Sequence, residues 1–157
     1  MFASITDRSL FSGGIDLGGT KIETKLFDAN MNEVAVRRTP TPRDNYDKLL
    51  AALLSEISWL RSTAGNAKMS VGLGLPGFID PCTGKSITSN LPATGRMLQA
   101  DLRVYAGCQI AVENDCNCFA LSEAHGGGGE GFHRVFGLIL GTGLGGGFCV
   151  DGALSFS

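Results

Sequence analysis

The polar trio Glu113-Asn114-Asp115 follows a short apolar run, Ile110 to Val112, and precedes a segment compatible with a helix. This order predicts a buried strand, a tight corner and a helix, with a carboxylate at the carboxyl end of the strand. In open α/β sheets, ligands bind in the crevice outside the carboxyl ends of the strands. Asn114 or Asp115 could equally serve as the helix N-cap, a position that Asn and Asp favour. Both roles stay open at this point.

Two glycine-rich stretches could bring backbone amides close to a phosphate group. The first, Gly14 to Lys21, reads Gly-Ile-Asp-Leu-Gly-Gly-Thr-Lys and lies between two predicted strands. Its turn exposes backbone N–H groups, Thr20 adds a hydroxyl group, and the small residues allow close approach. Asp16 lies on the strand beside this turn and could hold Mg²⁺ directly or through water. The second stretch, Gly141 to Gly147, repeats the strand–glycine–strand order.

The glycine spacing also matches the dinucleotide-binding fingerprint G-x-G-x-x-G, at Gly72 to Gly77 and at Gly141 to Gly146. In the Rossmann fold this fingerprint opens a helix whose N-terminus holds the pyrophosphate. Here the first stretch leads into a proline-flanked turn and the second into Phe148-Cys149-Val150, which is typical of a strand. The context therefore argues against a dinucleotide site of the Rossmann type.

Hydrophobic periodicity predicts the elements that must position these residues. Strands are predicted at 11–17, 22–28, 33–38, 69–75, 109–112, 135–140 and 148–150, and helices at 46–60, 97–105 and 116–125. The first three strands are joined by short turns, so they should form an antiparallel meander. Asp44 or Asn45 should cap the first helix, whose leucine stripe faces the sheet. Gly126 to Gly129 is predicted as a flexible surface loop, and Asp151-Gly152 as a hairpin turn.

Composition favours one ordinary globular domain. The chain has 157 residues, 43% hydrophobic and 18% charged, with a formal net charge of −2. That charge provides no basic field for nucleic acid or an anionic membrane, and no apolar run approaches the ~20 residues that span a bilayer. Residues 1–10 lack the apolar core of a secretory signal. The five cysteines include no C-x-x-C pair, so we expect reduced thiols and a cytoplasmic location.

Four stretches together resemble the ROK family of sugar kinases, whose nucleotide-binding core has the ribonuclease-H-like fold of actin, Hsp70 and hexokinase. These stretches are Gly14–Ile22, Gly72–Gly77, Val112–Ala124 and Leu138–Gly147. The resemblance covers almost the whole chain from Gly14 onward. It implies an α/β ATPase lobe with a mixed sheet, an antiparallel N-terminal meander and flanking helices. Residues 1–157 would form a single N-terminal lobe, without the C-terminal lobe of the family.

The resemblance also implies a role for each matching residue. Asp115 would be the general base on the sugar 6-hydroxyl group, and Asn114, Gly77 and Asn90 would contact the sugar. ATP would be the phosphoryl donor, and Asp16 would bind Mg²⁺. The nucleotide phosphates would be held by residues of both glycine stretches: Gly14, Asp16, Gly18, Gly19, Thr20, Lys21, Gly141, Thr142, Gly143, Gly145 and Gly146. Such a site suffices because phosphoryl transfer chiefly needs positioning and charge neutralisation.

The sugar is indicated by finer similarity within the family. The stretches Pro40–Asp47 and Asn114–Glu123 look most like the ROK kinases that phosphorylate N-acetyl-D-glucosamine. A kinase of glucose, fructose or mannose is an alternative, and so is a sugar- or nucleotide-binding fragment without turnover. ROK transcription regulators share the core but carry an N-terminal helix-turn-helix, whereas only 13 residues precede Gly14 here.

Several family elements have no counterpart in this sequence. The Glu-x-Gly-His element, the Cys/His zinc cluster and a further sugar-binding Glu of ROK kinases are all missing, so no zinc site is expected within these 157 residues. The expected partners are therefore the sugar and ATP, with no nucleic acid and no membrane. Because family members are commonly dimers, the resemblance also raises a homodimer as an assembly.

Overall fold

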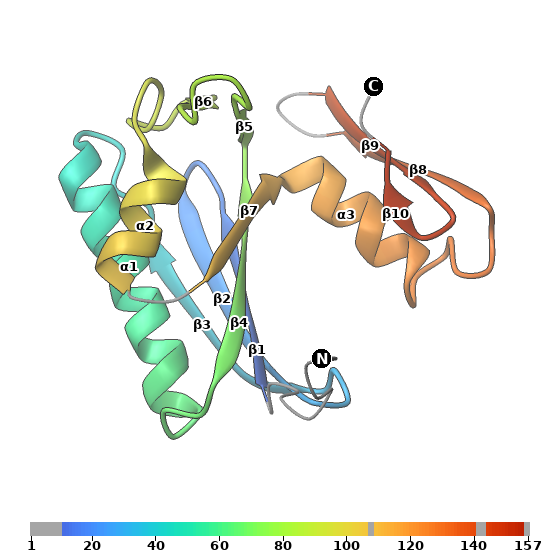
Figure 1. Cartoon of the computed structure of the whole chain (residues 1–157), viewed down its shortest axis with the longest axis horizontal. Coiled ribbons are helices and arrows are strands. Elements are labelled where there is room, and N and C mark those ends of the chain that lie inside the picture. Colours follow the sequence, from blue (N-terminus) through green and yellow to red (C-terminus); the bar gives the residue numbers. More distant parts are fainter. Residues whose placement is uncertain (1–10, 107–108, 141–143, 156–157) are drawn as a thin grey trace, which may run out of the picture. The chain divides into compact units, whose positions relative to one another are not determined.

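The computed structural model describes residues 11–106, 109–140 and 144–155. The chain divides after Val112 into two compact units. Along the chain the elements are β1 (Phe11–Leu17), β2 (Lys21–Asp28), β3 (Glu33–Pro40), α1 (Tyr46–Thr63), β4 (Met69–Leu75), β5 (Gly77–Ile79), β6 (Ser86–Thr88), α2 (Leu98–Ala106), β7 (Ile110–Asn114), α3 (Asp115–Ala124), β8 (Arg134–Leu140), β9 (Leu144–Val150) and β10 (Ala153–Leu154) (Figure 1). No helix within the described ranges is long and apolar enough to cross a membrane.

The first unit is built on a five-stranded sheet in the order β3-β2-β1-β4-β7. β1, β2 and β3 form the predicted antiparallel meander, and β4 runs parallel to β1, with Ile15 beside Leu73. Ile22, Thr24 and Leu26 of β2 are fully buried, as their alternation predicted. This mixed sheet with its helices confirms the predicted α/β fold class.

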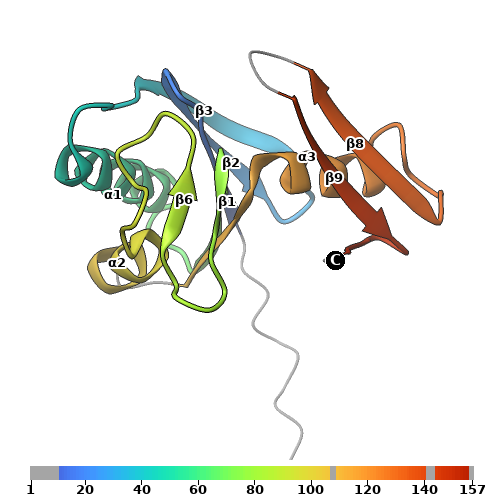
Figure 2. The ribbon, with the colours of Figure 1, turned by 90° about the horizontal axis from the view of Figure 1, so that it is seen from above.

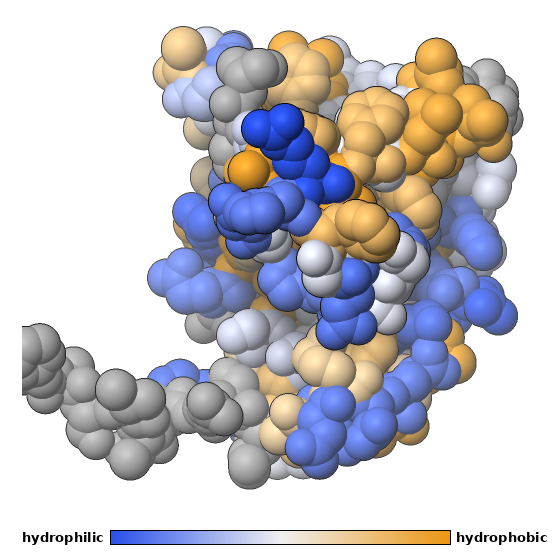
Figure 3. Space-filling view, turned by 90° about the vertical axis from the view of Figure 1, so that its right-hand side faces the viewer, coloured by the Kyte–Doolittle hydropathy of each residue, from blue (hydrophilic) through white to orange (hydrophobic). Residues whose placement is uncertain are grey.

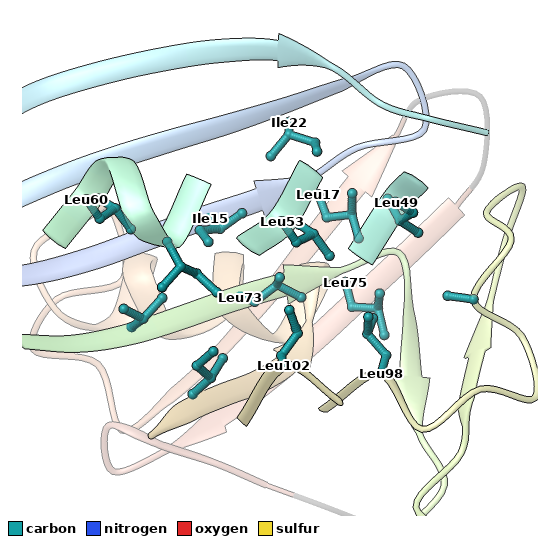
Figure 4. Packing of buried hydrophobic residues seen from close by; sticks show 14 of the residues in the cluster. Ile15, Leu17, Ile22, Leu49, Leu53, Leu60, Leu73, Leu75, Leu98 and Leu102 are labelled. Atoms are coloured by element: carbon teal, nitrogen blue, oxygen red, sulfur yellow. The ribbon is translucent and has the colours of Figure 1, made fainter. Parts of the chain in front are cut away.

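Helices α1 and α2 lie side by side against one face of this sheet (Figure 2). Leucines of α1 point toward the apolar side chains of β1, β4 and α2, as Figure 4 shows for Ile15, Leu17, Leu49, Leu53, Leu60, Leu73, Leu75, Leu98 and Leu102. Each of these side chains is at most 3% exposed. Burying a leucine contributes about 1.5–3 kcal/mol, so the stripe holds α1 on the sheet.

Side-chain hydrogen bonds fix where α1 begins. Of the two predicted N-caps, Asn45 takes the role: its Oδ1 accepts hydrogen bonds from the backbone N–H groups of Asp47 and Lys48 at 2.7 and 3.1 Å. Gly65 and Asn66 follow the end of the helix with φ of 65° and 59°. They form the predicted stop, because glycine and asparagine tolerate the left-handed backbone.

The second unit is a three-stranded antiparallel sheet, β10-β9-β8, with α3 packed on one face. Val135 and Cys149 are buried against Ala120 of α3. The other face carries exposed apolar side chains, at Phe136, Leu138, Leu140, Leu144 and Phe148. Figure 3 shows hydrophobic side chains gathered on the surface that it presents. We call these five residues the outer face of the β8–β9 hairpin.

Two loops of this unit were predicted from the sequence, and the structure defines the conformation of one and the hydrogen bonds of the other. Asp151 and Gly152 form the predicted hairpin turn, with φ of 52° and 73°. The glycine loop after α3 is not a free linker, because Glu123 accepts hydrogen bonds from Gly128 N–H at its side chain and from Gly129 N–H at its carbonyl group. The loop is thus on the surface as predicted, and two of its glycines are hydrogen-bonded to Glu123.

Candidate functional site

The turn between β1 and β2 consists of Gly18, Gly19 and Thr20. Gly18 N–H donates to the Lys21 carbonyl group at 2.9 Å and closes the turn. A Cβ atom at Gly19 would meet no atom within 4 Å, so the backbone there is open to a ligand. Within the described part of the chain, the N–H groups of Gly19 and Thr20 donate no hydrogen bond. Free amides beside open space suit an anion such as phosphate.

Asp16 lies on β1, two residues before this turn, with an exposed side chain. It faces Glu23 of β2 across the strand pair, so both carboxylates project from the same side of the sheet. Arg38 binds the Glu23 carboxylate, and this hydrogen bond lowers the pKa of Glu23. Mg²⁺ is usually held by one or two carboxylates together with substrate phosphates, so Asp16 beside the turn fits that ion. Among the described residues, no group of three or more His, Cys, Asp or Glu could hold a metal ion.

The other two residues predicted in this stretch lie beside the turn. Gly14 is inside β1, where a Cβ atom would make ordinary contact with the Phe27 ring at 3.7 Å. The exposed Lys21 begins β2, and its Nζ lies 3.6 Å from the Glu23 carboxylate. Lys21 therefore adds positive charge next to the turn, whereas Gly14 lies within β1, four residues before Gly18.

Gly77 has a structural role that its sequence did not indicate. It begins the short hairpin of β5 and β6, where it pairs with Thr88 at a φ of 152°. A Cβ atom here would lie 2.0 Å from the Ile87 carbonyl oxygen. The hairpin was not predicted, and its own backbone requires glycine at position 77 whether or not a sugar approaches.

Asn90 lies in the loop after β6 with a left-handed backbone, at a φ of 58°. Together with Arg43, Asp44, Leu91 and Pro92 it lines an open depression of about 600 Å³ in the first unit. The prediction did not include Arg43 among the site residues. Its only signal in the sequence was its place in the Pro40–Asp47 stretch, 47 positions before Asn90.

Asn114 and Asp115 lie at the start of α3, in the second unit. Asn114 is the N-cap, because its Oδ1 accepts hydrogen bonds from the backbone N–H groups of Cys116 and Asn117 at 3.0 and 3.2 Å. Asp115 is the first helical residue and is partly exposed. Its Oδ1 accepts from Cys116 N–H at 2.9 Å and from Asn114 Nδ2 at 3.1 Å. Capping thus falls mainly to Asn114, while the Asp115 carboxylate is also hydrogen-bonded to the Cys116 side chain.

Glu113 stabilises the junction between β7 and α3 through hydrogen bonds, a role that the sequence did not predict. Its Oε1 accepts hydrogen bonds from Asn114 N–H at 2.8 Å and from Asn117 Nδ2 at 3.0 Å. Because Glu113 lies in β7 and Asn117 in α3, no helical spacing in the sequence indicated this contact. Next to them, burial, followed by the charge of Asp115, raises the pKa of the Cys116 thiol. None of the four described cysteines, at 82, 116, 118 and 149, forms a disulfide.

The second glycine stretch differs from its prediction. Gly141, Thr142 and Gly143 lie outside the described residues. Gly145 and Gly146 are not in a loop: β9 already begins at Leu144, so they pair with Ile139 and Leu138 of β8. The predicted strand start at Phe148 is therefore wrong.

Close packing explains these glycines inside a strand. A Cβ atom at Gly145 would lie 2.4 Å from Cys116 Sγ, and one at Gly147 would lie 2.4 Å from the Cys116 carbonyl oxygen. On the opposite face, a Cβ atom at Gly146 would lie 2.6 Å from the Phe136 ring. The glycines let α3 approach β9 and let Phe136 lie across the hairpin.

Known proteins resemble this chain in sequence and in fold. The family model described as "ROK family" matches residues 12–156. A protein named N-acetyl-D-glucosamine kinase from Photobacterium profundum is 46% identical over 140 residues, which are 88% of this chain and 46% of that protein. The chain therefore spans about half the length of the curated relatives it matches.

Solved structures share the fold. A ROK family glucokinase from Streptomyces griseus, in complex with glucose and AMPPNP, superposes with a TM-score of 0.81 at 27% identity, covering 92% of this chain and 46% of that one. A ROK family transcriptional regulator, a homologue of the E. coli MLC protein, has a TM-score of 0.80 at 21% identity over 92% of this chain and 38% of its own. The fold alone thus occurs in both kinases and regulators. The family match across nearly every residue, together with the glycine turn and the Asn-Asp corner, shows that this chain belongs to the ROK family.

Proposed function

We propose that this chain is the N-terminal part of an ATP-dependent sugar kinase that phosphorylates the 6-hydroxyl group of N-acetyl-D-glucosamine. The sugar is taken from the name of the relatives that are 43–46% identical. ATP is taken from the neighbour solved with the ATP analogue AMPPNP. The regulator among the structural neighbours, at 21% identity, supports only the common fold.

Asp115 provides the strongest support for the chemistry. A general base must offer an oxygen within hydrogen-bond reach of the hydroxyl group that it deprotonates. One oxygen of Asp115 is fixed by Cys116 N–H and by the Asn114 side chain. The carboxylate therefore has a defined orientation, and its Oδ2 can accept the proton of the sugar 6-hydroxyl group. Asn114 would contact the neighbouring part of the sugar.

The β1–β2 turn would bind the ATP phosphates. It would contribute the N–H groups of Gly19 and Thr20, which donate no hydrogen bond within the described ranges, the Thr20 hydroxyl group and the positive charge of Lys21. Gly141, Thr142 and Gly143 would join them. We propose Asp16 as the protein ligand for Mg²⁺, which would neutralise charge on the phosphates. Asn90 would contact the sugar at the depression that Arg43 also lines. Gly77, in the neighbouring hairpin, would let the sugar approach the backbone.

The proposal extends to the setting of the reaction. ATP and a free sugar are the only partners we assign, without nucleic acid or membrane, and we place the protein in the cytoplasm. The zinc cluster of the family would lie in the half of the relatives that this chain does not cover. A homodimer is the assembly that we infer from the resemblance to the family.

The test is a phosphorylation assay on two proteins. One is this chain, and the other is an extended form in which the remaining half of the Photobacterium profundum relative follows Ser157. We expect the extended form to phosphorylate N-acetyl-D-glucosamine with ATP and Mg²⁺, and to prefer it to glucose, fructose and mannose. Equal rates on all four sugars would overturn the sugar assignment. ATP binding without turnover in the extended form would favour a binding function instead.

A further inference from the structure

The segment after β3 is hydrogen-bonded to the β1–β2 turn through one residue, Thr41. Its hydroxyl group donates to the Gly18 carbonyl oxygen at 2.8 Å. Its backbone N–H donates to the Thr20 carbonyl oxygen at 3.0 Å. Thr41 thus contacts the first and the last residue of a three-residue turn. Its side chain is buried, with 7% of the residue exposed, so water competes little for these bonds.

These bonds determine where the amides of the turn point. A peptide unit is planar and trans, so its carbonyl group and its N–H group point in opposite directions. The carbonyl group of Gly18 shares its peptide unit with the N–H group of Gly19. Because Thr41 holds that carbonyl group, the Gly19 N–H group is directed away from Thr41. It makes no hydrogen bond within the described residues, and the space around Gly19 is open.

The backbone around Thr41 is itself restrained by proline on both sides. Pro40 ends β3 and pairs with Lys21, which follows the turn on β2. Pro42 disfavours a helical conformation at the residue before it, so Thr41 stays extended. Two prolines and one strand pair therefore place the Thr41 hydroxyl group, with little conformational freedom left to lose.

We propose that Thr41 is a positioning residue for nucleotide binding, which orients the Gly18–Gly19 peptide so that the Gly19 amide faces a phosphate group. This rests on the proposed ATP site at the β1–β2 turn. Thr41 itself would touch neither the nucleotide nor the sugar. Its loss should therefore weaken ATP binding without changing the affinity for the sugar.

The experiment compares Thr41→Val with Thr41→Ser in the full 157-residue chain and in the extended form. Valine keeps the shape and removes the hydroxyl donor, whereas serine keeps the donor. We expect Thr41→Val to raise the Kd for Mg-ATP by about 3- to 10-fold, the effect of one lost hydrogen bond. We expect the Kd for Mg-ATP of Thr41→Ser to lie within about twofold of the wild-type value. In the extended form the KM for ATP should rise while the KM for the sugar stays constant.

Thr39→Val is the matched control. The Thr39 hydroxyl group, on β3 two residues before Thr41, donates at 2.9 Å to the buried Glu56 and not to the turn. This change should lower the melting temperature and leave ATP binding unaltered. An NMR spectrum gives a second measurement that needs no nucleotide: the Gly19 amide resonance should shift in Thr41→Val and return in Thr41→Ser.

The outcomes separate this inference from the proposed function. Wild-type affinity for ATP in Thr41→Val, or a serine variant as weak as the valine variant, overturns the positioning role while the ATP site stands. If the Gly19 resonance does not move in Thr41→Val, the role is overturned as well. Failure of both wild-type proteins to bind ATP overturns the proposed function and, with it, the role of Thr41.

Discussion

The side chain of Asn114 donates a hydrogen bond from Nδ2 to Oδ1 of its neighbour Asp115, at 3.1 Å, while its own Oδ1 caps α3. One residue thus holds the helix and orients the carboxylate. The two adjacent residues therefore divide structure and chemistry between them, and mutations can separate these roles.

Asp115→Asn should remove the proposed base and preserve the helix. We expect turnover in the extended form to fall by about 10²- to 10⁴-fold, the usual contribution of a general base. The melting temperature should change little, because Asn114 still caps α3. Asn114→Ala is the control, with an expected loss of about 1 kcal/mol in stability. Normal turnover in Asp115→Asn, measured by a coupled kinase assay, would show that the base is wrongly assigned.

Gly77→Ala should destabilise the first unit. The added Cβ atom would lie 2.0 Å from the Ile87 carbonyl oxygen, on a backbone that disfavours side chains. We expect a loss of about 1–3 kcal/mol, as for other overpacked sites. Gly72→Ala is the control on the preceding strand, where a Cβ atom would meet nothing within 4 Å. Urea denaturation compares the two, and equal stabilities would contradict the hairpin geometry.

Gly19→Ala should impair ATP binding and leave the fold intact. A methyl group at Gly19 meets no protein atom within 4 Å, so it would occupy the space into which we place a phosphate group. We expect the Kd for Mg-ATP to rise by about tenfold or more, which corresponds to about 1.4 kcal/mol. Gly18→Ala should instead lower the melting temperature, because its Cβ atom would lie 2.9 Å from the Lys21 carbonyl oxygen. Calorimetric titration that finds tight ATP binding in Gly19→Ala would remove the turn from the proposed site.

Acid should weaken the meander through Glu23. The hydrogen bond from Arg38 lowers the pKa of Glu23, so this pair stabilises the fold when the carboxylate is charged. The contribution is present above the unfolded pKa of about 4.3 and is lost as the pH falls through the lower folded value. Melting temperatures between pH 6 and pH 3 should therefore fall less in Glu23→Gln than in the wild type. If the melting temperature falls with pH equally in both proteins, the contact between Arg38 and Glu23 does not contribute to stability.

Asn90→Gly should raise the KM for the sugar in the extended form. Glycine adopts the left-handed backbone of Asn90 without strain, so the change removes only the side-chain amide. We expect an increase of about tenfold, with the KM for ATP and the melting temperature unchanged. Met31→Gly is the control, since Met31 has a similar φ of 63° in a turn and does not line the depression. An unchanged KM for the sugar would exclude Asn90 from the sugar site.

The fold was predictable where periodicity was strong. The alternation of Ile22, Thr24 and Leu26 and the leucine stripe of α1 depend only on local spacing, and both were confirmed. β5 and β6 were missed because three-residue strands are too short to show a period. Gly145 and Gly147 were assigned to a loop because their reason lies elsewhere in the chain: α3 packs on them.

The sequence could propose the candidate site residue by residue, but it could not predict the contacts that support those residues. Asp115 and the glycine turn are contiguous motifs, so the sequence alone could propose them. Thr41 contacts Gly18 from 23 residues away, and Arg43 meets Asn90 at the same depression. Such pairs become visible only when the chain has folded, because nothing in the local sequence links their positions.

The outer face of the β8–β9 hairpin has a consequence for the solubility of the purified chain. Its five large apolar side chains are exposed on one face of the hairpin, and a net charge of −2 gives neighbouring molecules little mutual repulsion. Colloidal stability is therefore lowest near the isoelectric point of about 5.6. We therefore expect dilute samples in buffers well above that pH to stay dispersed, and a polar residue in place of the exposed Leu138 to reduce precipitation.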